Sequence, residues 1–242
     1  MFKSSDRYGD RLNSYDVLKL VALLTMIIDH VGYYLLQDVQ WLRAVGRMAF
    51  PLFLFLVGYS GVWKIKHDIV IWAVLIAVCG MLTYQPLFPL SILVTILFVR
   101  LAMSLLVKHF TMTPLFLAIL YVACVALFPY FYWCDYSSIA LLFAMSGYLQ
   151  RQQPRSTLSL TFLYAAMAVH FTIETTTFSF LFPAWLCMAV TLAWALNLMH
   201  CFTIRSVTGG PHRVLQWASR NTLPIYGGHV MLLMIAQHLY IA

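Results

Sequence analysis

The chain has 242 residues, of which 62% are hydrophobic and only 10% are charged, and its formal net charge is +7. A soluble domain carries about a quarter charged residues, so this composition excludes an ordinary globular protein and indicates a lipid environment. Apolar runs use nearly the whole length, and we expect one integral-membrane domain over residues 1–242.

The first fifteen residues are polar, and no small-residue cleavage site follows the first apolar run, which indicates a retained first helix. The apolar runs between successive breaks number about nine: 16–36, 45–63, 69–84, 90–107, 113–129, 136–149, 157–173, 178–200 and 221–241. The sequence therefore predicts an all-α, polytopic bundle of about nine transmembrane helices.

The positions of lysine and arginine predict the orientation of these spans. Arg43 is the exception among the loop residues; the others lie in the N-terminal tail or in the even-numbered gaps: Lys3, Arg7, Arg11, Lys64, Lys66, Lys108, Arg151, Arg155, Arg205, Arg213 and Arg220. The positive-inside rule then places the N-terminus in the cytoplasm and the C-terminus outside. Because topology explains these charges, we expect no nucleic-acid partner.

The cysteines give no sign of a metal centre. Cys79, Cys124, Cys134, Cys187 and Cys201 show no metal-ligand spacing, and most lie within apolar runs. We interpret them as packing residues, and we expect neither a metal nor a disulfide framework.

The first two runs contain an unusual group of ionisable residues. Asp29 and His30 are adjacent inside the first run, and Arg47 stands shortly before Pro51 at the head of the second. Ionisable side chains at membrane depth are costly, so the group is a candidate functional site. His30 should lie roughly 20 Å above the cytoplasmic start of its helix. Because Pro51 lacks an N–H, the carbonyl of Arg47 loses its helical partner, and we expect a bend there, with the freed carbonyl available to a ligand.

Four further ionisable residues lie in later runs. Arg100 is near the middle of the fourth run, and His170 and Glu174 are one helical turn apart near the outer end of the seventh. His229 follows a Gly227-Gly228 pair that we expect to be flexible.

The chemistry that this set suits is acyl transfer. A neutral imidazole can accept the proton of an amine or hydroxyl that attacks a thioester. Asp29 lies about 100° round the helix from His30, so we expect it to pair with Arg47 or another span rather than with that ring. Arg47 or Arg100 could stabilise an oxyanion or bind a phosphate.

Structural alternatives exist for the same residues. Asp29 and Arg47 would also serve as an ion pair that joins two helices, and Arg100 would satisfy backbone carbonyls. His170 and Glu174 would be interfacial residues, and His229 a packed polar residue.

Three motifs stand out in the sequence: Leu18-Lys-Leu-Val-Ala-Leu-Leu-Thr-Met-Ile-Ile-Asp-His30, Gly46-Arg-Met-Ala-Phe-Pro-Leu-Phe53, and Ser219-Arg-Asn-Thr-Leu-Pro-Ile-Tyr226 with His229. In this order they resemble the TraX family. This family takes its name from a conjugative-plasmid protein that acetylates the N-terminus of pilin, and it is similar to the multi-spanning acyltransferases that act on heparan glucosaminide and on bacterial glycans.

The resemblance implies an acetyl-CoA-dependent acetyltransferase of the bacterial inner membrane. His30 would be the catalytic histidine with Asp29 and Arg47 as partners, and His229 would match a late histidine that could itself be the base. Candidate residues for binding acetyl-CoA are Arg100, His229, Arg205, His212, Arg213 and Arg220, of which the loop residues would meet the nucleotide phosphates. The acceptor would be pilin or another envelope molecule.

Three alternatives to pilin acetylation remain. One is O-acetylation of an envelope glycan. Another is small-solute or proton-coupled transport through a relay of Asp29, His30, Arg100 and Glu174. The third is a non-catalytic factor in the assembly of pili or envelope complexes.

Overall fold

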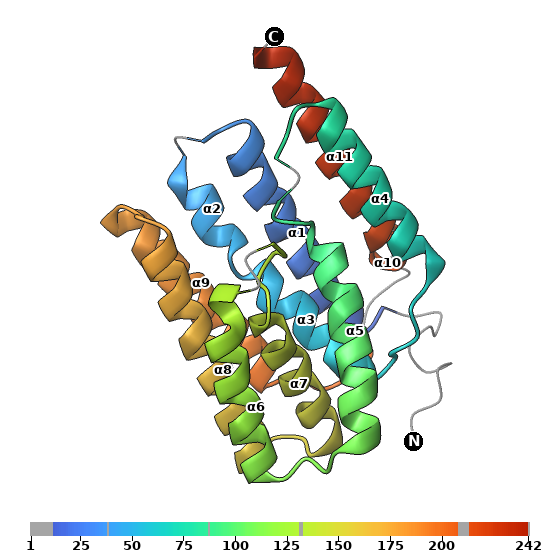
Figure 1. Cartoon of the computed structure of the whole chain (residues 1–242), viewed down its shortest axis with the longest axis vertical. Coiled ribbons are helices and arrows are strands. Elements are labelled where there is room, and N and C mark those ends of the chain that lie inside the picture. Colours follow the sequence, from blue (N-terminus) through green and yellow to red (C-terminus); the bar gives the residue numbers. More distant parts are fainter. Residues whose placement is uncertain (1–11, 38, 87, 131–132, 208–212, 242) are drawn as a thin grey trace.

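The computed structural model describes residues 12–37, 39–86, 88–130, 133–207 and 213–241, and these form an all-α protein (Figure 1). The helices are α1 (Ser14–Tyr34), α2 (Gln40–Gly46), α3 (Ala49–Ser60), α4 (His67–Leu82), α5 (Ile92–His109), α6 (Pro114–Leu127), α7 (Ile139–Gln152), α8 (Thr157–Thr177), α9 (Phe182–His200), α10 (Arg213–Arg220) and α11 (Thr222–Ile241). A short 3₁₀ helix, Phe128–Tyr130, follows α6. Within the described ranges there is no strand, which confirms the all-α prediction.

Each apolar run predicted from the sequence coincides with a helical region. Five of these regions are long and apolar enough to cross a membrane: Ser14–Tyr34, Gln40–Ser60, Ile92–His109, Thr157–Thr177 and Phe182–His200. The fold is therefore consistent with a membrane protein. The count of nine spans and the cytoplasmic N-terminus stay predictions, and Lys3, Arg7 and Arg11, on which the orientation partly rests, lie outside the described residues.

The centre of the bundle is the contact between α3 and α7, and both lie among α5, α6, α8 and α9 in Figure 1. A Cβ at Gly58 would lie 1.7 Å from the carbonyl oxygen of Ala144, and a Cβ at Gly147 would lie 2.0 Å from that of Phe55. Small residues let two helix backbones approach closely without an aqueous driving force. As a result, ten of the 14 residues of α7 are buried.

A second group of helices packs beside this centre. Helices α4 and α11 run side by side in Figure 1, and α1 contacts both α3 and α11. Gly227 lies against the ring of Trp72, where a Cβ would come within 2.0 Å of a ring carbon. The expectation that Gly227 and Gly228 are flexible is wrong, because both lie within α11, and Gly227 serves close packing.

The second predicted run forms two helices, and the break between them falls at Arg47. Helix α2 ends at Gly46 and α3 begins at Ala49, so the helix is interrupted at Arg47, as the position of Pro51 predicts. The helical region also begins earlier than the predicted residue 45. Arg43 interrupts the apolar pattern before residue 45, yet it lies on α2. Its guanidinium forms an ion pair with Asp29 of α1.

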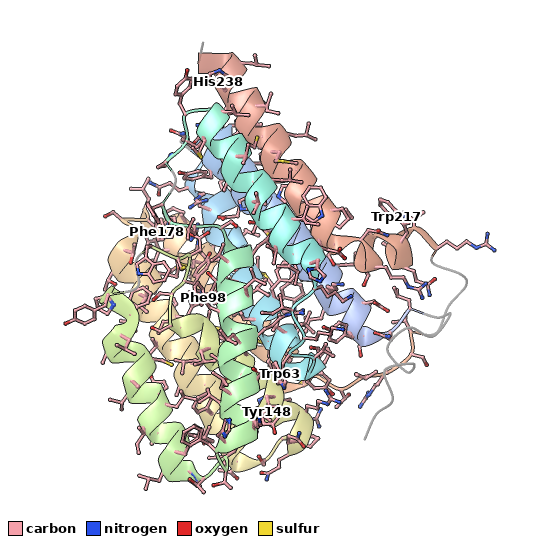
Figure 2. The ribbon with its side chains drawn as sticks, turned by 45° about the vertical axis from the view of Figure 1, so that its right-hand side comes forward. Trp63, Phe98, Tyr148, Phe178, Trp217 and His238 are labelled. Atoms are coloured by element: carbon pink, nitrogen blue, oxygen red, sulfur yellow. The ribbon has the colours of Figure 1, made fainter. Side chains whose placement is uncertain are left out.

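The segment before α10 and α10 itself are both hydrogen-bonded to the start of α1. The backbone N–H of Ser14 donates to the carbonyl of Arg205 at 2.9 Å, and Ser219 of α10 donates from Oγ to Asp16 at 2.6 Å. Trp217 is 61% exposed and projects from α10, away from the bundle (Figure 2).

Candidate active site

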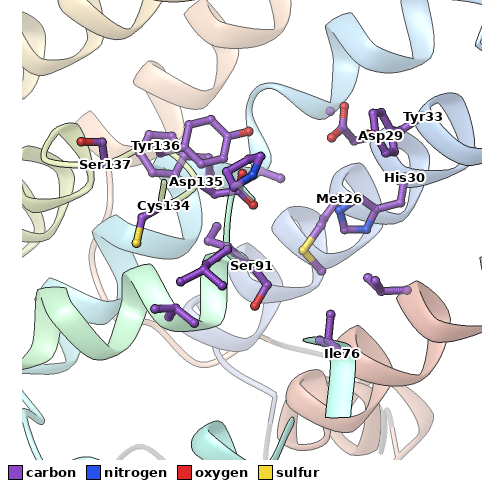
Figure 3. A pocket seen from close by; sticks show the side chains of 18 of the residues that line it. Met26, Asp29, His30, Tyr33, Ile76, Ser91, Cys134, Asp135, Tyr136 and Ser137 are labelled. Atoms are coloured by element: carbon purple, nitrogen blue, oxygen red, sulfur yellow. The ribbon is translucent and has the colours of Figure 1, made fainter. Parts of the chain in front are cut away.

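A cavity of about 830 Å³ lies among α1, α2, α3, α4, α5, α8 and α11 (Figure 3). The connections between α4 and α5 and between α6 and α7 complete its wall. One part of the wall is polar and consists of Asp29, His30, Arg43, Arg47, Asp135, Tyr136, His170 and Glu174. Another part is apolar and comes mainly from Val70, Ala73, Val74 and Ala77 of α4 and from Val94 and Leu97 of α5. The cavity thus offers ionisable groups at one wall and a hydrocarbon surface at another.

Asp29 is held by two arginines. Its Oδ1 accepts from Nη2 of Arg47 at 3.0 Å, and its Oδ2 accepts from Nη1 of Arg43 at 3.1 Å. The side chain of Asp29 is only 12% exposed. Charge-assisted hydrogen bonds of this kind offset the cost of burying a carboxylate. The prediction that Asp29 pairs with Arg47 is confirmed, and Arg43 is a second partner.

Arg47 joins several elements through one guanidinium. Besides Asp29, it donates from Nε to the carbonyl of Arg43 at 3.2 Å and lies with Nη1 3.5 Å from Oε2 of Glu174 on α8. Nη1 is also 3.5 Å from the hydroxyl of Tyr136, and the ring of Phe178 stacks on the guanidinium, 4.6 Å away. Its side chain is 5% exposed. These contacts make Arg47 the hub that connects α1, α2 and α8.

The carbonyl of Arg47, which Pro51 leaves without a helical donor, is taken by a side chain of the protein. Nε2 of His170 lies 3.3 Å from that oxygen and donates to it. The carbonyl therefore has one partner within the protein, and its availability to a ligand stays a prediction. His170 and Glu174 are only 1% and 2% exposed, so their interpretation as interfacial residues is wrong.

His30 belongs to a second group, formed with α11. Nδ1 of His30 lies 2.8 Å from Nε2 of His229, and the two rings stack with centroids 5.0 Å apart. Nδ1 of His229 in turn lies 2.8 Å from the carbonyl oxygen of Ile225. In Figure 3 His30 projects beside Met26, with Asp135 and Tyr136 across the cavity.

The hydrogen-bond order assigns the tautomers of both neutral histidines. A carbonyl oxygen only accepts, so Nδ1 of His229 carries the proton and its Nε2 is an acceptor. Nδ1 of His30 must then donate, which leaves the lone pair of His30 on Nε2. In the described part of the chain no group hydrogen-bonds to that nitrogen, and His30 lines the cavity. The arrangement presents the neutral imidazole of His30 to the cavity, and the hydrogen bond from its Nδ1 to His229 fixes the orientation of the ring.

Asp135 lies on the connection between α6 and α7. Its backbone N–H donates to the carbonyl of Leu90 at 3.1 Å, and its own carbonyl accepts from Oγ1 of Thr95 at 2.7 Å. Burial of the carboxyl raises the pKa of Asp135 to about 7. The side chain therefore contributes a group to the cavity that titrates near neutrality.

Comparison with known proteins is consistent with the motifs around these residues. The family model described as TraX protein matches residues 14–237. This chain belongs to the TraX family. It is also 33% identical over 87 residues to an uncharacterized protein of Rickettsia prowazekii (strain Madrid E). That match covers 36% of this chain and only 35% of the relative's length. No solved structure matches the chain.

In this TraX-family protein, several predicted site residues do not line the cavity. His229 reaches it only through His30, and Arg100 donates from Nη1 to the carbonyl of Lys64 at 2.9 Å, as its structural alternative predicts. Arg205, Arg213 and Arg220 are exposed and are not part of the cavity wall. His212 lies outside the described residues. Of the proposed set, the structure brings together His30, Asp29, Arg47 and His229.

Sequence reasoning missed Arg43, Asp135 and Tyr136 as members of the site. Arg43 carried a signal, because it is the one arginine that departs from the charge pattern of the predicted loops and so needs a reason other than topology. Asp135 and Tyr136 carried none, since they stand in a short connection. No group of three or more His, Cys, Asp or Glu residues suited to a metal occurs among the residues that the structure describes.

Proposed function

We propose that this protein is a membrane-embedded acetyltransferase that moves an acetyl group from cytoplasmic acetyl-CoA to an acceptor at the outer side of the inner membrane. Membership of the TraX family supports a conjugation-associated, pilin-related role, and the N-terminal amine of pilin is the proposed acceptor. The observation that carries the proposal is the chain from the Ile225 carbonyl through His229 to His30, which leaves Nε2 of His30 as a base at the cavity.

In this proposal His30 is the general base. Its Nε2 accepts the proton of the amine as the C–N bond forms and returns it to the sulfur as the C–S bond breaks. The imidazolium that exists between these two transfers donates through Nδ1 to His229, which hydrogen-bonds the Ile225 carbonyl in turn. His229 is therefore a positioning residue, and His30 is the base.

The two arginines have different roles. The contacts of Arg47 use Nε, Nη1 and Nη2, so this residue is assigned to holding Asp29 and the helices in place. Arg43 binds Asp29 through Nη1 and is 18% exposed at the cavity. Its remaining N–H groups make it the better candidate to stabilise the oxyanion of the acyl-transfer step.

Depth along α1 bears on how the two substrates meet. His30 lies 16 residues beyond Ser14, or about 24 Å along the helix axis. A nucleotide at the cytoplasmic end would need a long arm to present its thioester there. The apolar wall from α4 and α5 supports such an arm, and the exposed Arg205, Arg213 and Arg220 stay candidates for its phosphates.

The test is mass spectrometry of pilin purified from cells that produce it together with the wild type, His30→Ala or the control His238→Ala. His238 is also on α11 but packs on Tyr84 and does not line the cavity. We expect a mass increase of one acetyl group on pilin in the wild type and the control, and its loss in His30→Ala. Acetylation of pilin that persists in His30→Ala would contradict the proposal. Acetylation of a glycan but not of pilin would show that the acceptor is a glycan.

Transport is a less favoured function. A relay through Asp29, His30, Arg100 and Glu174 needs all four residues along one path, but Arg100 lies outside the cavity wall. Solute uptake by proteoliposomes without acetyl-CoA would support transport.

A further inference from the structure

Glu174 is a buried acid whose partners in the described part of the chain are distant. The residue is 2% exposed, yet its Oε2 accepts no hydrogen bond from a described residue. Nη1 of Arg47 lies 3.5 Å from Oε2, and Nδ1 of His170 lies 3.8 Å from Oε1. Both separations exceed the usual length of a charge-assisted hydrogen bond. A buried carboxylate normally finds close donors, so Glu174 has unused capacity to accept.

The charges around the cavity point to the kind of group that would use this capacity. Its wall carries the carboxyl groups of Asp29, Asp135 and Glu174 but only the guanidinium groups of Arg43 and Arg47. Asp29 has the close contacts with both arginines, at 3.0 and 3.1 Å. Glu174 shares Arg47 at the longer distance. The lining contains no lysine, so Arg47 is the arginine of the wall that Glu174 shares.

We propose that Glu174 receives the amine of the acceptor as an ammonium group and thereby selects amines over hydroxyl groups. Before the attack, the ammonium passes one proton to the Glu174 carboxylate, and the free amine then loses its second proton to His30; the proton on Glu174 is released to solvent with the products. An ammonium supplies a positive charge and up to three N–H donors to Glu174, whereas a hydroxyl supplies one uncharged donor. With a hydroxyl acceptor, Glu174 would keep only its long contact with Arg47 as charge compensation. The inference rests on the proposed acetyl transfer. It assigns the selection of an amine acceptor to Glu174 on α8.

The test compares two probes that differ in one group. One is a short peptide that begins with alanine, and the other is the same peptide with lactic acid in place of that alanine, which replaces the amine by a hydroxyl. Binding to the purified full-length protein is measured in detergent without acetyl-CoA, so the result does not depend on catalysis. We expect the wild type to bind the amine on the order of tenfold more tightly.

Three variants distinguish the role of Glu174 from a general effect of charge. Glu174→Gln should bring the two affinities together, and Glu174→Asp should keep part of the preference for the amine. Asp68→Asn, which removes an exposed carboxyl on α4 outside the cavity, should keep all of it. If Glu174→Gln does not fold, the comparison of Glu174→Asp with the wild type still tests the proposal, because Glu174→Asp should keep only part of the preference for the amine.

Two outcomes would overturn the assignment. One is a wild type that binds both probes equally, and the other is a folded Glu174→Gln that still prefers the amine, for example because Asp135 provides the charge. An amine preference that depends on Glu174 in a protein that transfers no acetyl group would instead contradict the proposed function and leave the amine site standing. In active protein, Glu174→Gln should raise KM for the amine peptide more than it lowers kcat.

Discussion

Gly46 lies so close to Asp29 that a Cβ at position 46 would stand 2.1 Å from the Cβ of Asp29 and 2.6 Å from its Oδ1. The absence of a side chain at Gly46, the first residue of the second motif, therefore makes room for the side chain of Asp29. We predict that Gly46→Ala displaces Asp29 from its two arginines and destabilises the protein by about 1–3 kcal/mol, as overpacking does elsewhere.

Gly228 provides the matched control for this substitution. It also lies within a helix, but a Cβ there meets no atom within 4 Å. Gly228→Ala should leave stability unchanged or raise it by up to about 1 kcal/mol through helix propensity. Thermal unfolding of both variants in detergent checks the pair, and equal melting temperatures would contradict the role of Gly46.

His30 and His229 should differ in their effect on transfer. In the proposed acetyl transfer, removal of the proposed base in His30→Ala should lower the rate at least about a hundredfold. His229→Ala removes only the group that orients the base, so we expect a loss of about tenfold to a hundredfold in kcat with little change in KM. Initial rates of acetyl transfer measure both. A wild-type rate in His229→Ala would show that the orientation of His30 does not depend on this contact.

The two arginines around Asp29 should be unequal in stability. Arg47→Met removes a buried guanidinium from both Asp29 and Glu174, and loss of one partner from a buried ion pair costs about 3–5 kcal/mol. Arg43→Met leaves Asp29 with Arg47 and should cost less. Chemical or thermal unfolding of the purified variants provides the comparison, and a greater loss in Arg43→Met would reverse the assignment of Arg47 as the hub.

Asp135 should make stability depend on pH. Its pKa of about 7 in the folded protein lies above the usual value of 3.8, so the folded protein binds more protons than the unfolded chain between about pH 4 and pH 7. Stability should therefore fall as the pH rises through that window, by up to about 4 kcal/mol from this group. Asp135→Asn should remove this contribution. Melting temperatures at pH 5 and pH 7.5 test it, and an unchanged pH dependence in the variant would contradict it.

Some of the site was predictable because its information is local. Asp29 and His30 are conspicuous as charged residues within an apolar run, and the effect of Pro51 on the carbonyl of Arg47 follows from one missing N–H four residues away. The helical offset between neighbouring residues also predicted that Asp29 turns away from the ring of His30. Each of these inferences needed only the geometry of a single helix.

The remaining contacts join residues far apart in the sequence. His30 and His229 are separated by 199 positions, and His170 and Arg47 by 123. The sequence contains each residue, but it does not say which faces of α1, α8 and α11 meet. For the same reason Glu174 resembled an interfacial acid until its helix was placed against Arg47.

The sequence by itself determined the class of the protein, the positions of its helices and the residues from which a reactive centre could be built. These features depend on hydropathy and on single-helix geometry, which act over a few turns. Only the tertiary structure decided that Arg43 shares Asp29, that His170 takes the Arg47 carbonyl, and that His229 supports His30. Such choices depend on how elements distant in the chain pack together, as they do at glycines 46, 58, 147 and 227, where an absent Cβ allows close contact.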